Sequence, residues 1–148
     1  MRVLNELLAN RVLWVAVSGW FVAQALKVVF TYIIERRWDL GRFFGLGGMP
    51  SSHSAVVCGM ATAVGIARGF YSIEFTMAFV TASVVMTDAA GVRRAAGKQA
   101  VVLNKILQDM VAGGLNSGNE ALKELLGHTP FEVLIGGLLG ILLAVLIM

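Results

Sequence analysis

The sequence predicts an all-α integral membrane protein with about four transmembrane helices and one amphipathic helix at the membrane interface. Composition is the first reason: the 148 residues are 57% hydrophobic and only 14% charged, with a mean hydropathy of +0.78. Soluble domains are about 45–50% apolar and about 25% charged. The other reasons are that the apolar residues gather in long runs and that the chain suits one domain, so we expect a single membrane domain over residues 1–148.

The same composition excludes several classes of protein. Cys58 is the only cysteine, which excludes an intrachain disulfide and a zinc cage built from cysteines. A nucleic-acid binder would show a basic surface on a polar domain, and the sequence has no such domain. We therefore expect no nucleic-acid partner and no zinc site of this kind. No other metal and no cofactor are expected either.

The first expected span covers residues 13–34 and contains one charge, Lys27. About 20 apolar residues cross a bilayer core of roughly 30 Å. A signal peptide is the competing interpretation. Glu6, Arg11 and the lack of a small-residue cleavage site after a short apolar core argue against it.

Three further spans are expected at residues 51–67, 75–90 and 131–148. A polar, glycine-rich loop at 35–50 separates the first two spans, and the short turn at 68–74 makes the second and third antiparallel neighbours. Asp88 lies near the end of the third span. Glu132 is the single charge of the last one.

Between the third and fourth spans, residues 93–110 carry apolar side chains at 96, 100, 103, 107 and 110. Steps of three and four residues place these side chains on one helical stripe. We interpret the segment as an amphipathic helix that lies in the interface or against the bundle. Glycines at 113–118 should end it, and Asn119 can cap a short helix that stops at Gly127.

Four spans place both termini on one side of the membrane, with the loops 35–50 and 91–130 on the other. Those two loops hold eight basic residues, whereas Arg2, Arg11 and Arg68 are the three on the terminal side. Cytoplasmic loops attract Lys and Arg. We therefore expect a multi-pass protein of the plasma membrane whose loop side faces the cytoplasm.

The rare ionisable groups of the spans gather on this loop side. They are Lys27, His53, Asp88, His128 and Glu132. A charge near the membrane core costs about 2.5–3.5 kcal/mol on insertion scales, so such groups usually pair or line a polar cavity. Two imidazoles with cations and carboxylates suit an anion that carries a transferable group.

The loop at residues 45–54 adds an argument for phosphate. Its glycines let backbone amides approach a ligand closely, and Pro50 with the following serines opens a helix. The first amides of a helix have no partner within it and bind phosphate well. His53 would stand beside that anion, and imidazole exchanges protons near neutral pH.

These residues resemble a known family. Residues 50–53, Pro-Ser-Ser-His, resemble the Pro-Ser-Gly-His signature of the type 2 phosphatidic acid phosphatase superfamily, which also includes vanadium-dependent haloperoxidases. The chain is most similar to a divergent branch of small membrane proteins described as acid phosphatase/vanadium-dependent haloperoxidase-related. The matching stretches are 48–54, 88–94 with 97–100, and 127–133.

The resemblance implies a role for each residue. His128, in a His-x-x-x-Glu pattern where the superfamily has His-x-x-x-Asp, would attack phosphorus, and Glu132 would orient it. His53 would protonate the leaving alkoxide. The resemblance implies that Lys27, Arg36 or Arg37, and Arg93 or Arg94 would hold the phosphate. The full expected substrate-binding set adds the helix-start serines Ser51 and Ser52, and Asp88, which can pair with one of these arginines.

Several of these residues have a second interpretation. Thr129, Pro130 and Glu132 also form a capping-box pattern, with Pro at the first helical position. Lys27 can snorkel toward the loop side, and His53 can simply bond the glycine loop. Arg93 and Arg94 fit positive-inside topology equally well. Gly136-x-x-x-Gly140 permits close helix packing, including that of a homodimer.

The leading functional hypothesis is a membrane phosphatase that hydrolyses a lipid or polyprenyl phosphate through a phosphohistidine. The alternative is a non-catalytic protein that binds or moves anionic lipids with a retained phosphate pocket. A vanadate-holding oxidase is a third hypothesis. Membrane lipids and the lipid phosphate are the expected partners, and a homodimer would complete a pocket that four spans enclose poorly.

Overall fold

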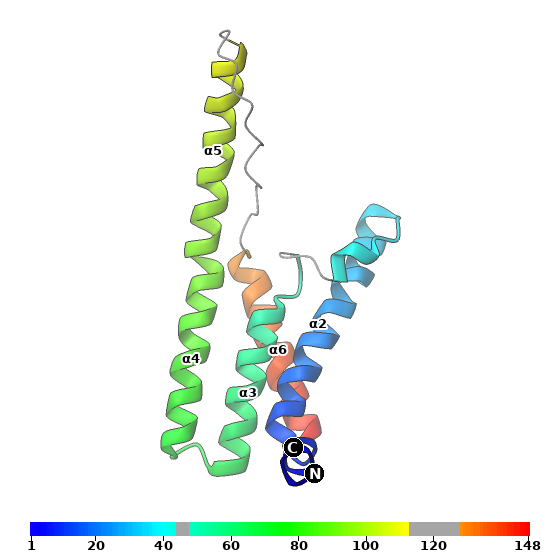
Figure 1. Cartoon of the computed structure of the whole chain (residues 1–148), viewed down its shortest axis with the longest axis vertical. Helices are drawn as coiled ribbons and strands as arrows, with labels where there is room; N and C mark the ends of the chain where they lie inside the picture. Colours follow the sequence, from blue (N-terminus) through cyan, green and yellow to red (C-terminus); the bar gives the residue numbers. More distant parts are fainter. Residues whose placement is uncertain (44–47, 113–127) are drawn as a thin grey trace.

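A computed structural model describes residues 1–43, 48–112 and 128–148, without the side chains of Leu40, Arg42, Arg93, Arg94 and 109–112. Every regular element in these residues is a helix (Figure 1). The elements are α1 (Arg2–Leu8), α2 (Arg11–Glu35), the 3₁₀ helix η1 (Leu40–Phe43), α3 (Ser52–Arg68), α4 (Ile73–Ala90), α5 (Val92–Ala112) and α6 (Pro130–Ile147).

Polar side chains fix where the bundle helices begin. Asn10, Ser51, Ser72 and Thr129 stand at the N-caps of α2, α3, α4 and α6, and each side chain accepts a hydrogen bond from a backbone N–H of the first turn. Such caps satisfy amides that have no partner inside the helix. The helices agree with the four expected spans to within about two residues at each end.

α3 occupies the centre of the bundle, where it packs against α2, α4 and α6 (Figure 1). It is rich in small residues, and its buried positions include Ser54, Ala55, Gly59 and Ala63. Small side chains let helix backbones approach one another closely in a membrane. The core is therefore formed by small side chains and close contacts between helix backbones rather than by bulky apolar side chains.

The closest approach is between α3 and α6. A Cβ added at Gly136 would meet the backbone oxygen of Ser51, and one at Gly140 would meet that of Ala55. The Gly136-x-x-x-Gly140 pair is thus occupied by packing within the chain. A homodimer would need a different surface, and the homodimer itself stays a prediction.

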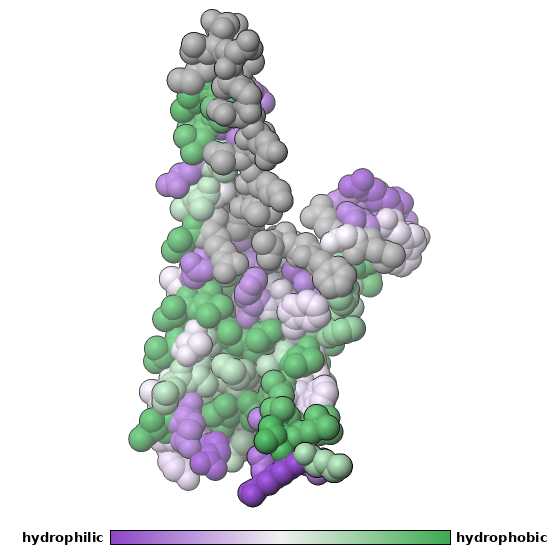
Figure 2. Space-filling view, viewed as in Figure 1, coloured by the Kyte–Doolittle hydropathy of each residue, from purple (hydrophilic) through white to green (hydrophobic). Residues whose placement is uncertain are grey.

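Three helices among the described residues are long and apolar enough to cross a membrane: Arg11–Glu35, the continuous run Ile73–Gln108, and Pro130–Ile147. α3, with 17 residues, is not among them, so the count of four spans stays a prediction. Its neighbours shield α3 from lipid, which explains why it can be less apolar. The face of the bundle seen in Figure 2 is largely apolar, and the exposed apolar residues of the bundle include Phe79, Leu138 and Leu142.

α5 differs from the expected amphipathic helix in its placement. It continues α4 in nearly the same direction and projects beyond the other bundle helices (Figure 1), instead of lying against them. Gly97 and Asn104 are buried, whereas Leu103, expected on the apolar stripe, is 48% exposed. The short helix expected from Asn119 to Gly127 lies outside the described residues.

The chain after α2 does not leave as a simple polar loop. Arg36 adopts the left-handed conformation and ends the helix, and Trp38 stacks on Tyr32 with 4.3 Å between ring centroids. The chain then folds back along α2, where Phe43 packs edge-on against Trp20 and Phe21 at 5.7 and 5.4 Å. We refer to residues 36–43 as the return segment.

Candidate functional site

Glu132 and His128 form the best-defined contact of the expected site. His128 lies just before α6 and is 4% exposed, and its Nδ1 is 3.1 Å from Glu132 Oε2. The same carboxylate oxygen accepts a hydrogen bond from the backbone N–H of Thr129, and Thr129 Oγ1 accepts one from the N–H of Glu132. The side chain of Glu132 therefore takes part both in the capping box and in the contact with His128.

His53 stands in the first turn of α3 and faces His128. Their ring centroids are 6.3 Å apart, with an angle of 63° between the ring planes. A backbone hydrogen bond of 3.1 Å from the N–H of Ser51 to the carbonyl of Glu132 ties the start of α3 to the start of α6. Two motifs separated by more than half of the chain thus meet at one end of the bundle.

Lys27 reaches the same end from α2 and is not snorkelling into solvent. It is 4% exposed, and its Nζ donates to Ser52 Oγ at 3.3 Å inside the bundle. A buried ammonium in a membrane helix needs an anion or polar oxygens nearby. Glu132 is the carboxylate that interacts with it electrostatically, so Lys27 and His128 share one acidic partner.

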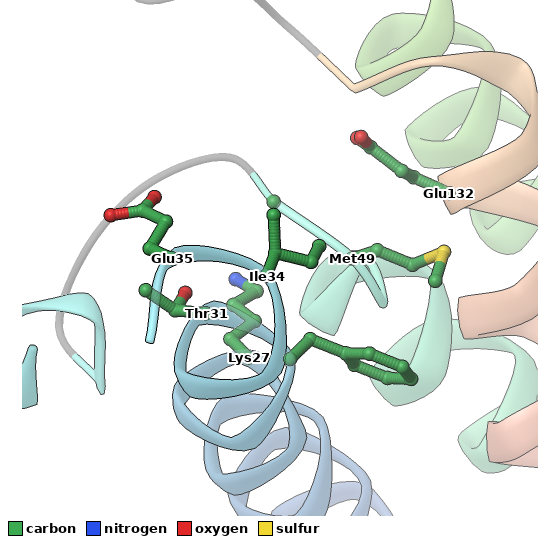
Figure 3. A pocket seen from close by; sticks show the side chains of 8 residues that line it. Lys27, Thr31, Ile34, Glu35, Met49 and Glu132 are labelled. Carbon is green, nitrogen blue, oxygen red and sulfur yellow. The ribbon is translucent and has the colours of Figure 1, made fainter. Parts of the chain in front are cut away.

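A pocket of about 360 Å³ opens beside Lys27. Figure 3 shows Lys27 coming from α2 and Glu132 from α6 on opposite walls. The two imidazoles do not line this pocket, but Glu132 connects His128 to it because Glu132 both lines the pocket and contacts His128. The lining residues are Lys27, Phe30, Thr31, Ile34, Glu35, Gly48, Met49 and Glu132.

The serines of the expected phosphate loop are buried. Ser51 Oγ caps α3 by accepting from the N–H and the hydroxyl of Ser54, and Ser52 Oγ accepts from Lys27. Ser52 therefore stands where it can share an anion with Lys27, whereas Ser51 holds the helix start. Glycines 45 and 47 of that loop lie outside the described residues.

The remaining expected substrate-binding residues are not gathered around Lys27. Arg36 and Arg37 are exposed beyond the end of α2. Arg37 bonds Glu35 at 2.7 Å, and this hydrogen bond raises the pKa of the Arg37 guanidinium. Asp88 lines a separate pocket of about 440 Å³ with Ser83 and Thr87 on α4. Arg93 and Arg94 start α5, and their side chains are among those not described.

Sequence reasoning missed Gln24. Its side chain is 5% exposed, and Oε1 has no hydrogen-bond partner in the structure as described. The available signal was a polar amide within an apolar span, three residues before Lys27 on the same side of the helix. The apolar pocket residues Phe30 and Ile34 had no comparable signal because apolar residues are common in every span. Met49, in the loop at 35–50, had none either.

These features define an integral membrane protein whose buried polar groups meet at one end of a helical bundle. The chain belongs to the Divergent PAP2 family, whose family model matches residues 8–143. It is 40% identical to the uncharacterized membrane protein YuiD of Bacillus subtilis (strain 168), over 96% of each chain. No solved structure matches the chain.

Proposed function

We propose that this protein is a phosphatase of the plasma membrane that hydrolyses a lipid or polyprenyl phosphate or diphosphate at its cytoplasmic face. The contact between His128 Nδ1 and Glu132 Oε2 at 3.1 Å carries the proposal. A nucleophilic histidine needs a partner that holds one ring nitrogen so that the other can attack. Membership in the Divergent PAP2 family supports phosphatase-related chemistry.

The first step of the proposed reaction transfers the phosphoryl group to the enzyme. With its proton on Nδ1 and donated to Glu132, His128 presents the lone pair of Nε2 to phosphorus. The new N–P bond forms as the P–O bond to the lipid breaks, and His53 gives a proton to the departing alkoxide. Lys27 balances the phosphate charge, a form of electrostatic stabilisation that is often the largest catalytic term.

The second step releases phosphate. Water attacks the phosphohistidine, His53 takes a proton from that water, and the N–P bond breaks to return His128 to its starting form. General acid–base catalysis of this kind typically contributes about 10²–10⁴-fold. The step uses water and groups of this chain alone.

Purified protein in detergent and lipid tests the proposal with a panel of lipid and polyprenyl phosphates. We expect phosphate release that vanadate inhibits, with loss of at least about 10²-fold in His128→Ala and His53→Ala. Quenching of the His53→Ala variant in alkali, in which phosphohistidine is stable, should trap this intermediate if His53 acts mainly in hydrolysis. Full activity of His128→Ala would exclude this mechanism.

The competing hypothesis is binding of anionic lipids without turnover. The capping box favours it, because capping alone gives Glu132 a structural reason to be present. Retention of a lipid phosphate by wild-type protein, with no phosphate released and reduced retention in Lys27→Met, would support this alternative.

A further inference from the structure

We propose that the return segment, residues 36–43, folds back so that Phe43 enters the apolar layer of the membrane in the same leaflet that contains the candidate site, while the charged Arg36 and Arg37 stay exposed beyond the end of α2. The proposal does not depend on the phosphatase function. It rests on the depth of the aromatic side chains that Phe43 contacts. The sequence had placed this segment in a polar loop outside the membrane.

Three contacts mark the two ends of the part of the bundle that we place in the membrane. At one end, the Arg11 side chain donates to the carbonyl of Met148. At the other end, Lys27 bonds Ser52, and the N–H of Ser51 bonds the carbonyl of Glu132. α6 fills the distance between them with 18 residues, about 27 Å at ~1.5 Å per residue, close to the roughly 30 Å of a bilayer core.

Trp20 lies near the middle of this layer. It comes nine residues after Arg11 and seven before Lys27, so it is about 10 Å below the Lys27 level at ~1.5 Å per residue. The ring centroid of Phe43 is 5.7 Å from that of Trp20. Phe43 therefore lies closer to the middle of the layer than Lys27 does. Because α2 ends at Glu35, on the other side of Lys27 from the middle, the chain has turned back toward the middle by residue 43.

The end of the segment that carries Phe43 packs on protein. Backbone that is not in a spanning helix is tolerated at membrane depth only where its polar groups are satisfied and it packs on protein. Residues 40–43 form a 3₁₀ turn, and Asp39 Oδ1 accepts a hydrogen bond from the N–H of Gly41. η1 packs along α2, where Trp20 and Phe21 receive Phe43.

Two buried residues of α2 lie on the same side of the helix as this contact. Gln24 lies four residues after Trp20 and three after Phe21, which places it on the helix face that receives Phe43. Val28 follows one turn later on the same face. Both are buried, at 5% and 7% exposed, although they lie on the side of α2 where Phe21 is 57% exposed.

Depth-dependent fluorescence quenching tests the proposal with the full-length protein in phosphatidylcholine vesicles. The chain has three tryptophans, Trp14, Trp20 and Trp38, so single-tryptophan reporters are made by replacing the others with Phe. The test reporter carries Phe43→Trp with all three native tryptophans replaced. A protein that retains only Trp20 is the reference for the middle of the layer. A protein that retains only Trp38 is the reference for the exposed end of the segment.

We expect lipid brominated in the middle of the acyl chains to quench the Phe43→Trp reporter about as strongly as the Trp20 reporter. Aqueous iodide should quench the Trp38 reporter and spare the Phe43→Trp reporter. Quenching of the Phe43→Trp reporter by iodide, with none by the brominated chains, would overturn the proposal.

Cysteine labelling is a second measurement, and it can still be made if the tryptophan variant folds poorly. In a Cys58→Ala background, Trp38→Cys should react with a water-soluble, membrane-impermeant maleimide added to open membranes. Phe43→Cys should resist the same reagent until the membrane is dissolved and the protein unfolded. Equal labelling of the two positions in intact membranes would contradict membrane insertion.

Discussion

Glu132 combines two tasks in one carboxylate, because it accepts from the Thr129 N–H and contacts His128 Nδ1. We expect Glu132→Gln to lower the phosphatase rate by about 10²-fold or more. The amide oxygen can still cap α6, but the negative charge that stabilises the ring as the N–P bond forms is gone. Initial-rate kinetics and thermal unfolding in detergent measure the two effects separately.

Thr129→Ala is the matched control for this prediction. It removes the hydroxyl that caps α6 and leaves the Glu132 carboxylate in place, so it should lower the free energy of unfolding by about 1 kcal/mol while activity stays near that of wild type. If both variants lose stability and activity in proportion, Glu132 acts only as a helix cap.

Gln24 leads to a prediction about stability. A buried polar group without a hydrogen-bond partner costs about 1–3 kcal/mol, and Gln24 Oε1 has none among the described residues. Gln24→Met keeps the length of the side chain and should raise the free energy of unfolding by a similar amount. Gln24→Glu, which buries a carboxylate, should lower it, and thermal unfolding in one detergent compares the three proteins. A less stable Met variant would show that the amide does have a partner.

At the scale of elements, the contact between α3 and α6 depends on glycine. Gly140→Ala forces a Cβ into the backbone of Ala55, so we expect a loss of about 3 kcal/mol or more of unfolding free energy. Gly137→Ala is the control, because its Cβ meets the Cys58 sulfur at 3.3 Å, a side chain that can shift. Tm values and the yield of folded protein that are equal for the two variants would contradict this account.

Most helices could be predicted because lipid imposes a simple rule on their composition. The runs that become α2, α4 and α6 need only be apolar and long enough. The return segment could not be predicted in this way, since Arg36, Arg37 and Asp39 made the loop look polar. Trp38 and Phe43 carried a contrary signal, but their partners Tyr32 and Trp20 are defined only by folding.

The site was predictable in part for a similar reason. His53, His128 and Lys27 stood out as rare polar groups at one end of apolar spans, and the structure brings them to the same end. Glu132, the partner that Lys27 and His128 share, reaches Lys27 because the backbone contact between Ser51 and Glu132 joins distant parts of the chain. The family resemblance implied Arg36 and Arg37, but a resemblance in residue type does not specify whether a side chain points toward a pocket.

For the whole molecule, the distribution of basic residues predicts that the end carrying Lys27 and both histidines faces the cytoplasm. Tags at the two termini should then both be accessible from outside intact cells, because the termini lie together at the opposite end (Figure 1). Surface labelling of each tag, with a cytoplasmic protein as a leakage control, measures this. Termini on different sides would contradict the topology.

The hydrogen bond between the Arg11 guanidinium and the carbonyl of Met148 has a consequence for gene duplication. Because the start of α2 and the end of α6 lie at neighbouring points, a tandem duplication of this bundle joined by a short peptide would give two copies with the same orientation in the membrane. Neither half would need to invert. Covalently linked pairs are therefore accessible to this fold in a single genetic event.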